Sequence, residues 1–497
     1  MGEITALVVV APEGVHSNWT MFNTNPETWG ELQKHVWSNI KWKGYTHHTS
    51  RKSTKAAIRE LNAALDFDGL AVLSITYDAA AQTKEGKAAL WEFLKRRKCR
   101  MVLDESPRIK TPSSQRTKTI IKAGKYAVER TILSGTPVAE SPFDCYSQIK
   151  FLEENFWKRN GIGNYAAFKA EFAEIQIMQQ DESGRWQPVE TKEPVAPEPD
   201  DAPVFDYGDD AGAGLSDLTA ADKKSNGVRY QPRAKHFENI KGYRNLDRLN
   251  ALIMSIGSRV LKDDVLDLPE KLYTMRLFEM TREQSRIYQE LRDDAIAWLN
   301  EQQFVSGILP IVRLLRLQQV TNGYTTPDGE DGNFTDIAGG NPRLDLQREI
   351  NDDVGQQPYI VWARFQRDID LISAQFKKDG HKVSVVDGRV VGKARERAKA
   401  QFKDGTVLRY IANPAAAAEG DTFVHCRRVT YYNNSFRLMH RQQSEDRTHR
   451  IGQKNDVLYD DIACSGTVDF KLIESLRSKI NVATQVMGDT YRDWLIS

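Results

Sequence analysis

The stretch that decides the fold is RMVLDESPRIK, residues 100–110. Its apolar run at 101–103 follows a basic cluster and is typical of a buried strand in a parallel sheet. Asp104 and Glu105 come directly after this run, at the end of the strand where open α/β sheets bind their ligands. The stretch therefore predicts an α/β domain with two adjacent carboxylates at the carboxyl edge of its sheet.

Adjacent carboxylates at such an edge suit metal-assisted hydrolysis. One can hold Mg²⁺ through its water shell, and the other can orient and deprotonate the attacking water. An Asp-Glu pair alone is weak evidence, because such pairs occur on most protein surfaces. The pair at 104–105 gains weight because a strand precedes it and the segment ILSGTP follows it at 132–137.

A second informative stretch is QSEDRTHRIGQ, residues 443–453. If it is helical, Gln443, Arg447 and Arg450 share one face, because they are spaced by four and three residues. Two guanidinium groups on one face could neutralise charge on a transferring phosphoryl group. The alternative is a solvated helix that carries surface pairs such as Asp446–Arg450.

The remaining pattern predicts two α/β halves. Apolar runs spaced by roughly 20–25 residues in the second half favour βα units and a parallel sheet. The strands expected in the first half are 6–11, 69–76, 100–105 and 130–134, with helices near 28–39, 54–65, 86–97 and 143–157. The strands expected in the second half are 359–364, 382–388, 408–413, 428–434 and 457–463. Residues 281–324 have a helical period and would join the halves.

Seven segments, taken in order, resemble the motifs of Swi/Snf-related ATPases of helicase superfamily 2, in a short bacteriophage or bacterial form. The matching segments are ALVVVAPEGVHSNW (6–19, motif Ia), LSITYD (73–78, Ib), DESPRIK (104–110, II), LSGTP (133–137, III), YIVWARFQRDIDLI (359–372, IV), ANPAAAAEGDT (412–422, V) and QSEDRTHRIGQ (443–453, VI). One such match arises easily by chance, but seven in the family's order do not.

The resemblance implies two RecA-like parallel-sheet lobes, the first N-terminally incomplete, that flank an ATP cleft and are joined by a helical bracket. We expect lobe 1 at 1–270, the bracket at 271–330 and lobe 2 at 331–497. Residues 181–232 are rich in acidic residues, proline and glycine, and predict a disordered or loosely held insertion within lobe 1. A plain linker is favoured over an acidic mimic of DNA phosphates.

The resemblance also implies an ATP-dependent translocase on double-stranded DNA, with ATP and Mg²⁺ as cofactors. Asp104 would hold Mg²⁺ through water and Glu105 would act as the base. The other residues implied in catalysis are Gln443, Arg447 and Arg450, and those implied in nucleotide binding are Gly420 and Asp421. DNA-backbone contacts are implied for Trp19, Lys110, Ser134, Thr136 and Arg364, although Trp19 could equally be a core residue.

One element of the family pattern is missing, the phosphate loop that ends in Gly-Lys-Ser/Thr. The Gly-Lys pairs at 86–87, 124–125 and 392–393 are followed by Ala, Tyr and Ala. Such a loop supplies backbone amides, a lysine and a hydroxyl to the phosphates and Mg²⁺. Either an upstream segment or another polypeptide supplies the loop, or the chain no longer hydrolyses ATP. Motif V also departs from the family's Gly-Gly pair, with Ala417–Ala418 in that region.

Two other functions remain open. The first is a strand-separating helicase of the DEAH type, which needs a wedge element that the sequence does not show. The second is a DNA-binding or assembly factor on a motor fold that does not hydrolyse ATP. DNA-stimulated ATP hydrolysis, with and without a restored phosphate loop, separates the three functions.

Composition fits a large enzyme that is not embedded in a membrane. The chain has 497 residues and a formal net charge of +1, so no global basic field indicates nucleic acid. The basic run LKRRKCR at 94–100 favours a solvated helix end over phosphate contacts. Four scattered cysteines favour reduced thiols, and no apolar run reaches membrane-spanning length. We expect a cytoplasmic protein, in the host cytoplasm if the gene is viral.

Overall fold

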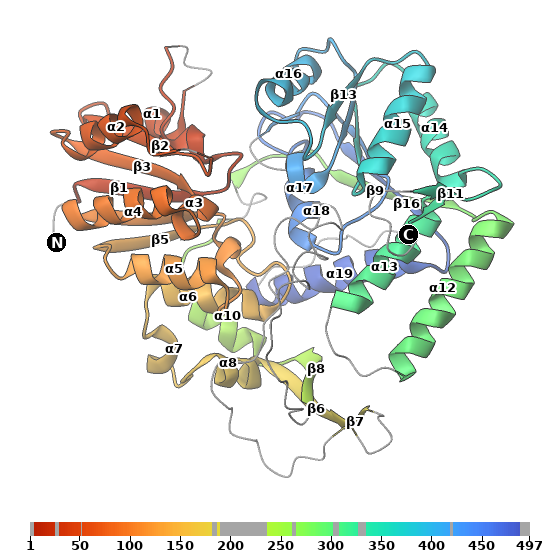
Figure 1. Cartoon of the computed structure of the whole chain (residues 1–497), viewed down its shortest axis with the longest axis horizontal. Helices are drawn as coiled ribbons and strands as arrows, with labels where there is room; N and C mark the ends of the chain where they lie inside the picture. The colour runs from red at the N-terminus through yellow and green to blue at the C-terminus, as the bar shows by residue number, and fades with distance from the viewer. Residues whose placement is uncertain are drawn as a thin grey trace.

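The protein consists of two α/β lobes that lie side by side (Figure 1). The computed structural model describes residues 4–24, 29–50, 52–180, 186–188, 236–260, 265–301, 308–326, 334–417 and 421–487. Lobe 1, in red and orange, comes from the N-terminal half of the chain, and lobe 2, in teal and blue, comes from the C-terminal half. Both parallel sheets of the predicted fold class are present, so that prediction is confirmed.

Lobe 1 is built on a five-stranded sheet in the order β2-β3-β1-β4-β5, in which every neighbouring pair is parallel. The strands are β1 (Ala6–Ala11), β2 (Trp42–His47), β3 (Leu70–Thr76), β4 (Cys99–Asp104) and β5 (Glu129–Leu133). The helical elements are η1 (His16–Trp19), α1 (Glu31–His35), α2 (Lys55–Leu65), α3 (Tyr77–Ala81), α4 (Lys84–Arg96), η3 (Ser106–Ile109), α5 (Gln115–Gly124), η4 (Pro142–Asp144), α6 (Cys145–Leu152), α7 (Phe156–Arg159), α8 (Tyr165–Phe172) and α10 (Leu246–Met254).

The central strand of this sheet is buried on both faces. Val8 and Val10 of β1 pack in the main core of the lobe, with side chains from α2, α4 and α5. Val9 and Ala11 point to the opposite face, where Trp19 packs against them. Successive strand residues alternate between faces, so both faces need apolar side chains and the strand reads as a continuous apolar run. The four strands expected in this half are confirmed, and β2 adds an edge strand.

Lobe 2 is built on a six-stranded parallel sheet in the order β13-β14-β12-β15-β16-β9. The strands are β9 (Lys271–Phe278), β12 (Tyr359–Trp362), β13 (Val383–Val386), β14 (Arg409–Ala412), β15 (Arg428–Tyr431) and β16 (Val457–Cys464). The helices are α14 (Pro342–Val354), α15 (Gln366–Lys378), α16 (Gly392–Lys403), α17 (Pro414–Ala417), α18 (Leu438–Glu445) and α19 (Val468–Met487). All five strands expected in this half are confirmed.

The predicted bracket at 271–330 needs one correction. Its first eight residues form β9, which pairs in parallel along the whole of β16 and so belongs to the lobe 2 sheet. Two helices make up the rest, α12 (Arg282–Glu301) and α13 (Ile308–Thr321), which pack on each other. A two-stranded ladder follows, of β10 (Tyr324–Thr325) and β11 (Thr335–Asp336).

The expected insertion at 181–232 lies almost entirely outside the described residues. Only β7 (Trp186–Pro188) is described within it, and β7 pairs antiparallel with β6 (Ala173–Gln180). The third strand of this small sheet is β8 (His236–Tyr243), on the other side of β6. The three residues of β7 are therefore part of a sheet and not of a loose linker.

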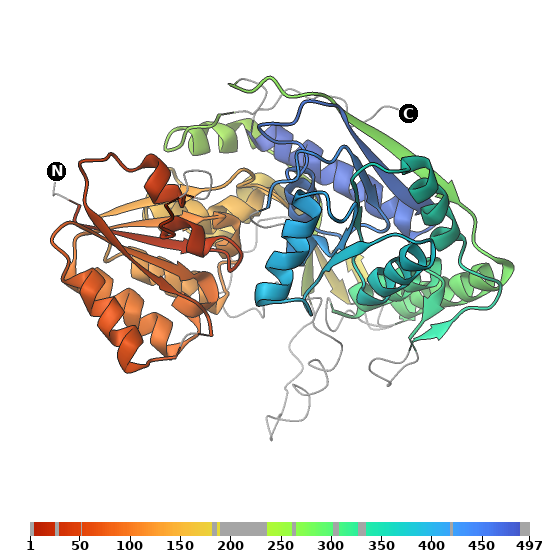
Figure 2. The same cartoon turned by 90° about the horizontal axis from the view of Figure 1, so that it is seen from above.

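The two lobes touch through their C-terminal helices. Helix α10 of lobe 1 packs against α19 of lobe 2, and Figure 2 shows the two helices together. The ammonium of Lys479 on α19 pairs with Glu140 of lobe 1 and donates to the carbonyl of Phe436 (2.6 Å). Among the described residues, no helix is both long and apolar enough to cross a bilayer.

A buried ion cluster fixes α18 on the lobe 2 sheet. Arg441 donates to both oxygens of Asp461 on β16 (2.5 and 3.0 Å) and to Glu445 (2.7 Å). Its guanidinium lies 3.5 Å from the ring centroid of Tyr431 on β15. Glu445 also accepts from Lys271 of β9 (3.0 Å). Burial by itself would raise the pKa of Glu445, but the charges of Lys271 and Arg441 hold it below its ordinary value.

We expect Arg441→Ala to lower the free energy of unfolding by about 3–5 kcal/mol, because it leaves the buried carboxylate of Asp461 without its cation and leaves Glu445 with Lys271 alone. Arg286→Ala is the matched control, since Arg286 also bridges two carboxylates but on the exposed surface of α12. Urea unfolding should show a large loss for the first variant and almost none for the second. Equal losses would mean that the buried cluster does not hold the lobe together.

Candidate functional site

The two carboxylates singled out in the sequence lie at the carboxyl end of β4. Asp104 ends the strand, and Glu105 takes the left-handed backbone conformation with φ 52°. The Asp104 side chain accepts a hydrogen bond from the indole of Trp19 (3.0 Å), and its main-chain carbonyl accepts from Tyr77 (2.8 Å). A left-handed backbone is uncommon for glutamate, and strained residues of this kind cluster at functional sites. The position and conformation thus agree with a catalytic role.

A polar chain connects this edge to the loop that follows β5. Ser106 donates to Gln148 of α6 (2.6 Å), and the Gln148 amide donates to the carbonyl of Pro137 (2.7 Å). Asp144 accepts from the backbone N–H of Glu140 (2.7 Å) and pairs with Lys110 (4.0 Å). Burial raises the pKa of Asp144, and the charge of Lys110 opposes that effect. The segments of motifs II and III are therefore held as one unit.

The arginines of the second stretch lie on lobe 2, but not on one helix. Helix α18 ends at Glu445, so Arg447 and Arg450 lie in the turn beyond it. The prediction of a single helical face is wrong for that reason. In the turn, the Arg447 carbonyl accepts from the N–H of Phe423 (2.7 Å). Arg447 still donates to the carbonyl of Gln443 (3.1 Å), which keeps these two residues together.

The two arginines have different surroundings. Arg447 is only 9% exposed and donates to the main-chain carbonyl of Asp421 (2.9 Å). Arg450 is exposed and contacts the hydroxyl of Thr422 at 3.4 Å. Asp421, an expected nucleotide contact, is buried and pairs with Lys399 of α16 (2.8 Å). The turn thus presents one buried arginine that holds the motif V backbone and one arginine that is open to solvent.

The other expected nucleotide contact, Gly420, lies outside the described residues. Of the five residues expected on the DNA path, Trp19 packs in a small apolar cluster and is bound to Asp104, which agrees with the core alternative. Ser134 and Thr136 lie half-buried in the loop after β5, where the Ser134 hydroxyl accepts from the Thr136 N–H (3.0 Å). DNA contacts by these residues stay predictions.

Arg364 is held by the bracket. Its guanidinium donates to Gln318 of α13 (3.1 Å) and lies over the rings of Phe365 and Phe436 (5.5 and 5.3 Å). Burial, and then the charge of Arg437, lowers its pKa to about 10. Its side chain therefore joins lobe 2 to the bracket, and its role on DNA stays a prediction.

The donor set fits Mg²⁺ that is held mainly by water and phosphates. Within the described ranges no group of three His, Cys, Asp or Glu side chains could enclose a metal ion. Mg²⁺ commonly keeps several waters and takes only one or two carboxylates from the protein. Asp104 offers one carboxylate, of which one oxygen is already bonded to Trp19. The site therefore suits an ion that arrives with its nucleotide.

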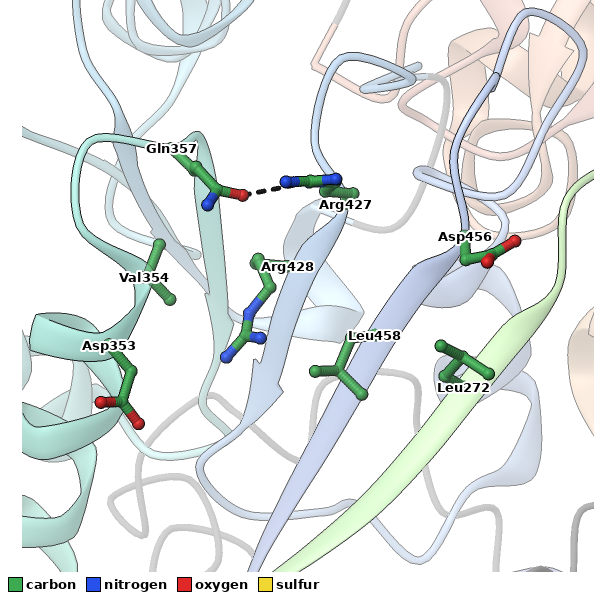
Figure 3. A pocket seen from close by; sticks show the side chains of 8 residues that line it. All are labelled: Leu272, Asp353, Val354, Gln357, Arg427, Arg428, Asp456 and Leu458. Carbon is green, nitrogen blue, oxygen red and sulfur yellow. Dashed lines mark hydrogen bonds between the residues drawn. The ribbon is translucent and has the colours of Figure 1, made fainter.

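A cavity of about 250 Å³ lies at the amino ends of strands of the lobe 2 sheet (Figure 3). It is lined by Leu272, Asp353, Val354, Gln357, Arg427, Arg428, Asp456 and Leu458. Arg428, Leu458 and Leu272 stand at the amino ends of β15, β16 and β9. The motif VI turn lies near these amino ends, because Gln453 donates to the carbonyl of Cys426 (3.2 Å) and His449 contacts the carbonyl of Pro269 ahead of β9 (2.7 Å).

Sequence reasoning missed the residues that position the site. Tyr77 lies inside the quoted segment LSITYD but was not expected to contact Asp104. Lys399 and Gln148 belong to helices without a motif, and no local signal marks their partners. Hydrogen bonds between residues 27 to 42 positions apart become visible only when the chain is folded.

The protein has two lobes, each built on a parallel sheet. Lobe 1 carries two carboxylates at a strand end, and lobe 2 carries two arginines in the turn after α18. This is the arrangement of the class of helicase-like ATPases. Two family models match this chain, the SNF2-related domain over residues 1–323 and the helicase conserved C-terminal domain over residues 344–452. The chain therefore belongs to the SNF2-related family, and it has a Swi2/Snf2-type ATPase and helicase core. The predicted resemblance is confirmed, while a bacteriophage origin stays a prediction.

Several relatives are similar over part of their length. An uncharacterized ATP-dependent helicase of Mycoplasma pneumoniae is 24% identical over 233 residues, which make up 46% of this chain and 22% of that protein. The CHD3-type chromatin-remodeling factor CHR7 of Arabidopsis thaliana is 23% identical over 267 residues, or 51% of this chain and 22% of CHR7. The match thus spans less than a quarter of either relative. The Sulfolobus solfataricus SWI2/SNF2 ATPase core in complex with dsDNA aligns with 98% of this chain and 84% of its own, at 18% identity and a TM-score of 0.36.

A buried carboxylate at the junction of lobe 2 and the bracket should titrate near neutral pH. Asp368 of α15 accepts from Asn322 (2.9 Å) and Asn433 (2.5 Å) through one oxygen, and the hydroxyl of Tyr324 also lies against its carboxylate. Burial raises its pKa from 3.8 to about 7.

We expect Asp368→Asn to stabilise the protein at pH 8 but not at pH 4. The pKa of Asp368 is higher in the folded state, so its contribution to stability is complete below about pH 4 and is lost as the pH rises through about 7. The asparagine variant lacks this loss, which is on the order of 4 kcal/mol. Chemical unfolding across this pH range, with the exposed Asp353→Asn as control, measures the difference. A constant difference between Asp368→Asn and wild type at all pH values would contradict the assignment.

Proposed function

We propose that this protein is an ATP-dependent DNA translocase of the Swi/Snf type. The observation that carries the proposal is the placement of Asp104 and Glu105 at the carboxyl end of β4, in a chain that belongs to the SNF2-related family. Ligands of open α/β sheets bind at that edge. Double-stranded DNA is the proposed partner, in line with the dsDNA named for the Sulfolobus core.

Each side chain has a proposed role that follows from its surroundings. Asp104 would hold Mg²⁺ through water, and Glu105 would orient and deprotonate the attacking water. Mg²⁺ would supply charge neutralisation at the phosphates. Arg450, which is exposed at the turn, would reach the γ-phosphate. Arg447 would position that turn, because it is buried and bonded to the backbone of Asp421.

We propose further that the phosphate loop is supplied upstream or by another polypeptide. The printed sequence contains no Gly-Lys-Ser/Thr. In the part of the chain that the structure describes, β5 pairs with β4 alone, its residues are half-exposed, and Leu133 is 40% exposed. A strand added in parallel to β5 would end at the same edge as Asp104. The loop after such a strand would therefore reach the carboxylates.

Two other functions remain as alternatives. The missing Gly-Lys-Ser/Thr favours a DNA-binding or assembly factor that does not hydrolyse ATP. A strand-separating helicase of the DEAH type would need a wedge that opens the duplex. ATP hydrolysis and strand displacement, measured separately, distinguish the motor from both alternatives.

We place the protein in the cytoplasm, or in the cytoplasm of the host if the gene is viral.

The first functional test restores the phosphate loop. Residues 1–497 alone should hydrolyse ATP slowly or not at all, and the protein with a restored loop, fused or added as a second chain, should show turnover stimulated by double-stranded DNA. Glu105→Gln in the restored protein should abolish turnover and keep ATP binding, because the amide preserves shape but cannot accept the proton. Glu92→Gln, on the exposed side of α4, is the control. Turnover close to wild type in Glu105→Gln would remove the motif II assignment.

The second functional test separates the two arginines. Arg450→Ala should reduce turnover by about 10³-fold or more with an unchanged melting temperature, since it removes a contact to transition-state charge from an exposed position. Arg447→Ala should reduce turnover and also lower the melting temperature, because it leaves the carbonyl of Asp421 without its donor. Turnover and melting curves of both variants decide the roles. A stable and fully active Arg450→Ala protein would contradict the proposal.

A further inference from the structure

Lobe 1 carries a cluster of exposed apolar side chains that the ATPase site does not use. We define the aromatic patch as the exposed Met21, Phe22, Trp37 and Ile40 together with the half-buried Trp42. Trp37 is 76% exposed and Phe22 is 71% exposed, the two largest values among the large apolar side chains of the described residues. The ring of Phe22 contacts that of Trp42, and Trp37 and Ile40 lie in the segment that leads from α1 into β2. Burial of exposed apolar side chains of this kind is favourable, and exposed apolar surface marks interaction sites.

The fold holds the aromatic patch in a defined shape. The main chain of Asn23 is bonded twice to the side chain of Gln33 on α1 (2.8 and 2.7 Å). The hydroxyls of Thr20 and Thr46 are 2.5 Å apart, which fixes this segment to β2. The rings of Phe22 and Trp42 lie 6.2 Å apart between centroids. The segment before α1, the end of α1 and the start of β2 are thus joined into one surface.

Close approach of the backbone supports the same arrangement. A side-chain carbon added at Gly30 would come within 2.3 Å of the carbonyl oxygen of Met21. A carbon added at Gly44 of β2 would come within 2.9 Å of the Thr20 side chain. Only glycine allows these segments to pack so closely. The backbone segments that carry Met21, Phe22 and Trp42 are therefore held together by close packing.

The charges around the aromatic patch have one dominant sign. Lys34, Lys41 and Lys43 are exposed there, together with His35. The nearby carboxylate of Glu31 is already paired with Lys34 (3.3 Å) and with His35 (3.6 Å). A ligand of this surface must therefore carry negative charge for the lysines and offer flat apolar faces to the aromatic rings.

We propose that the aromatic patch binds single-stranded nucleic acid, with bases stacked on Trp37 and Phe22 and phosphates near Lys41 and Lys43. Aromatic platforms beside lysines are the usual means of binding unpaired strands, because every base has a π-face and every linkage has a negative charge. Bases in a duplex are stacked on one another and do not offer these faces. The patch thus adds a base contact that a motor gripping the duplex backbone does not need, and it goes beyond the proposed function.

The test is DNA binding without nucleotide, so failure of the ATPase proposal does not affect it. Fluorescence anisotropy would measure the affinity of the whole chain for a labelled 20-nucleotide dT strand. Trp37→Ala and Phe22→Ala should each weaken binding at least about fivefold. Trp37→Phe should retain most of the affinity, because the aromatic face remains. Tyr126→Ala, at an exposed aromatic residue outside the patch, is the control and should bind like wild type.

A salt titration tests the lysines. Lys41→Glu with Lys43→Glu should weaken binding and lower the slope of log K against log salt by about 1.4, for two lost phosphate contacts. Lys377→Glu with Lys378→Glu, on α15 of lobe 2, makes the same charge change and should have little effect. Unchanged dT binding in both Trp37→Ala and Phe22→Ala would overturn the proposal. A change confined to self-association, seen by sedimentation, would overturn it as well and assign the patch to a protein interface.

Discussion

The buried pairing of Arg441 with Asp461 and Glu445 is the interaction on which the functional half of lobe 2 depends. It ties α18 to β16, while Lys271 extends the cluster to β9 at the sheet edge. Removal of charge from water is costly, so this cluster is stable only while all its members are present. The turn that carries Arg447 begins directly where α18 ends, so the cluster that holds α18 also fixes the start of this turn.

In lobe 1, hydrogen bonds hold the strand end that carries Asp104 in place. At the end of β4, the Asp104 carboxylate accepts from the indole of Trp19, and the Asp104 main-chain carbonyl accepts from the hydroxyl of Tyr77. The link between the lobes is narrow by comparison, through α10, α19 and the pair of Lys479 with Glu140. Rigid lobes with a narrow junction are the arrangement that hinge closure around a ligand requires.

The sequence predicted the regular elements well, because their signal is local. Continuous apolar runs identified nine strands, including β1, β4 and β12. The sequence analysis missed β2, because the segment WKGYTH mixes glycine and lysine with aromatic residues and only one face of the strand is buried. It assigned β9 to the bracket, because the pairing of β9 with β16 joins residues that are nearly two hundred positions apart.

What the sequence by itself determined is the family, the two α/β lobes and the position of Asp104 and Glu105 at a strand end, because each follows from neighbouring residues. What only the tertiary structure decided is the division of roles between side chains of the same type. Arg447 is buried and bonded to a backbone carbonyl, while Arg450 is exposed. Trp19 packs in a core, although Trp37 is open to solvent. Burial depends on which distant segments pack against a residue, and spacing along the chain does not contain that information.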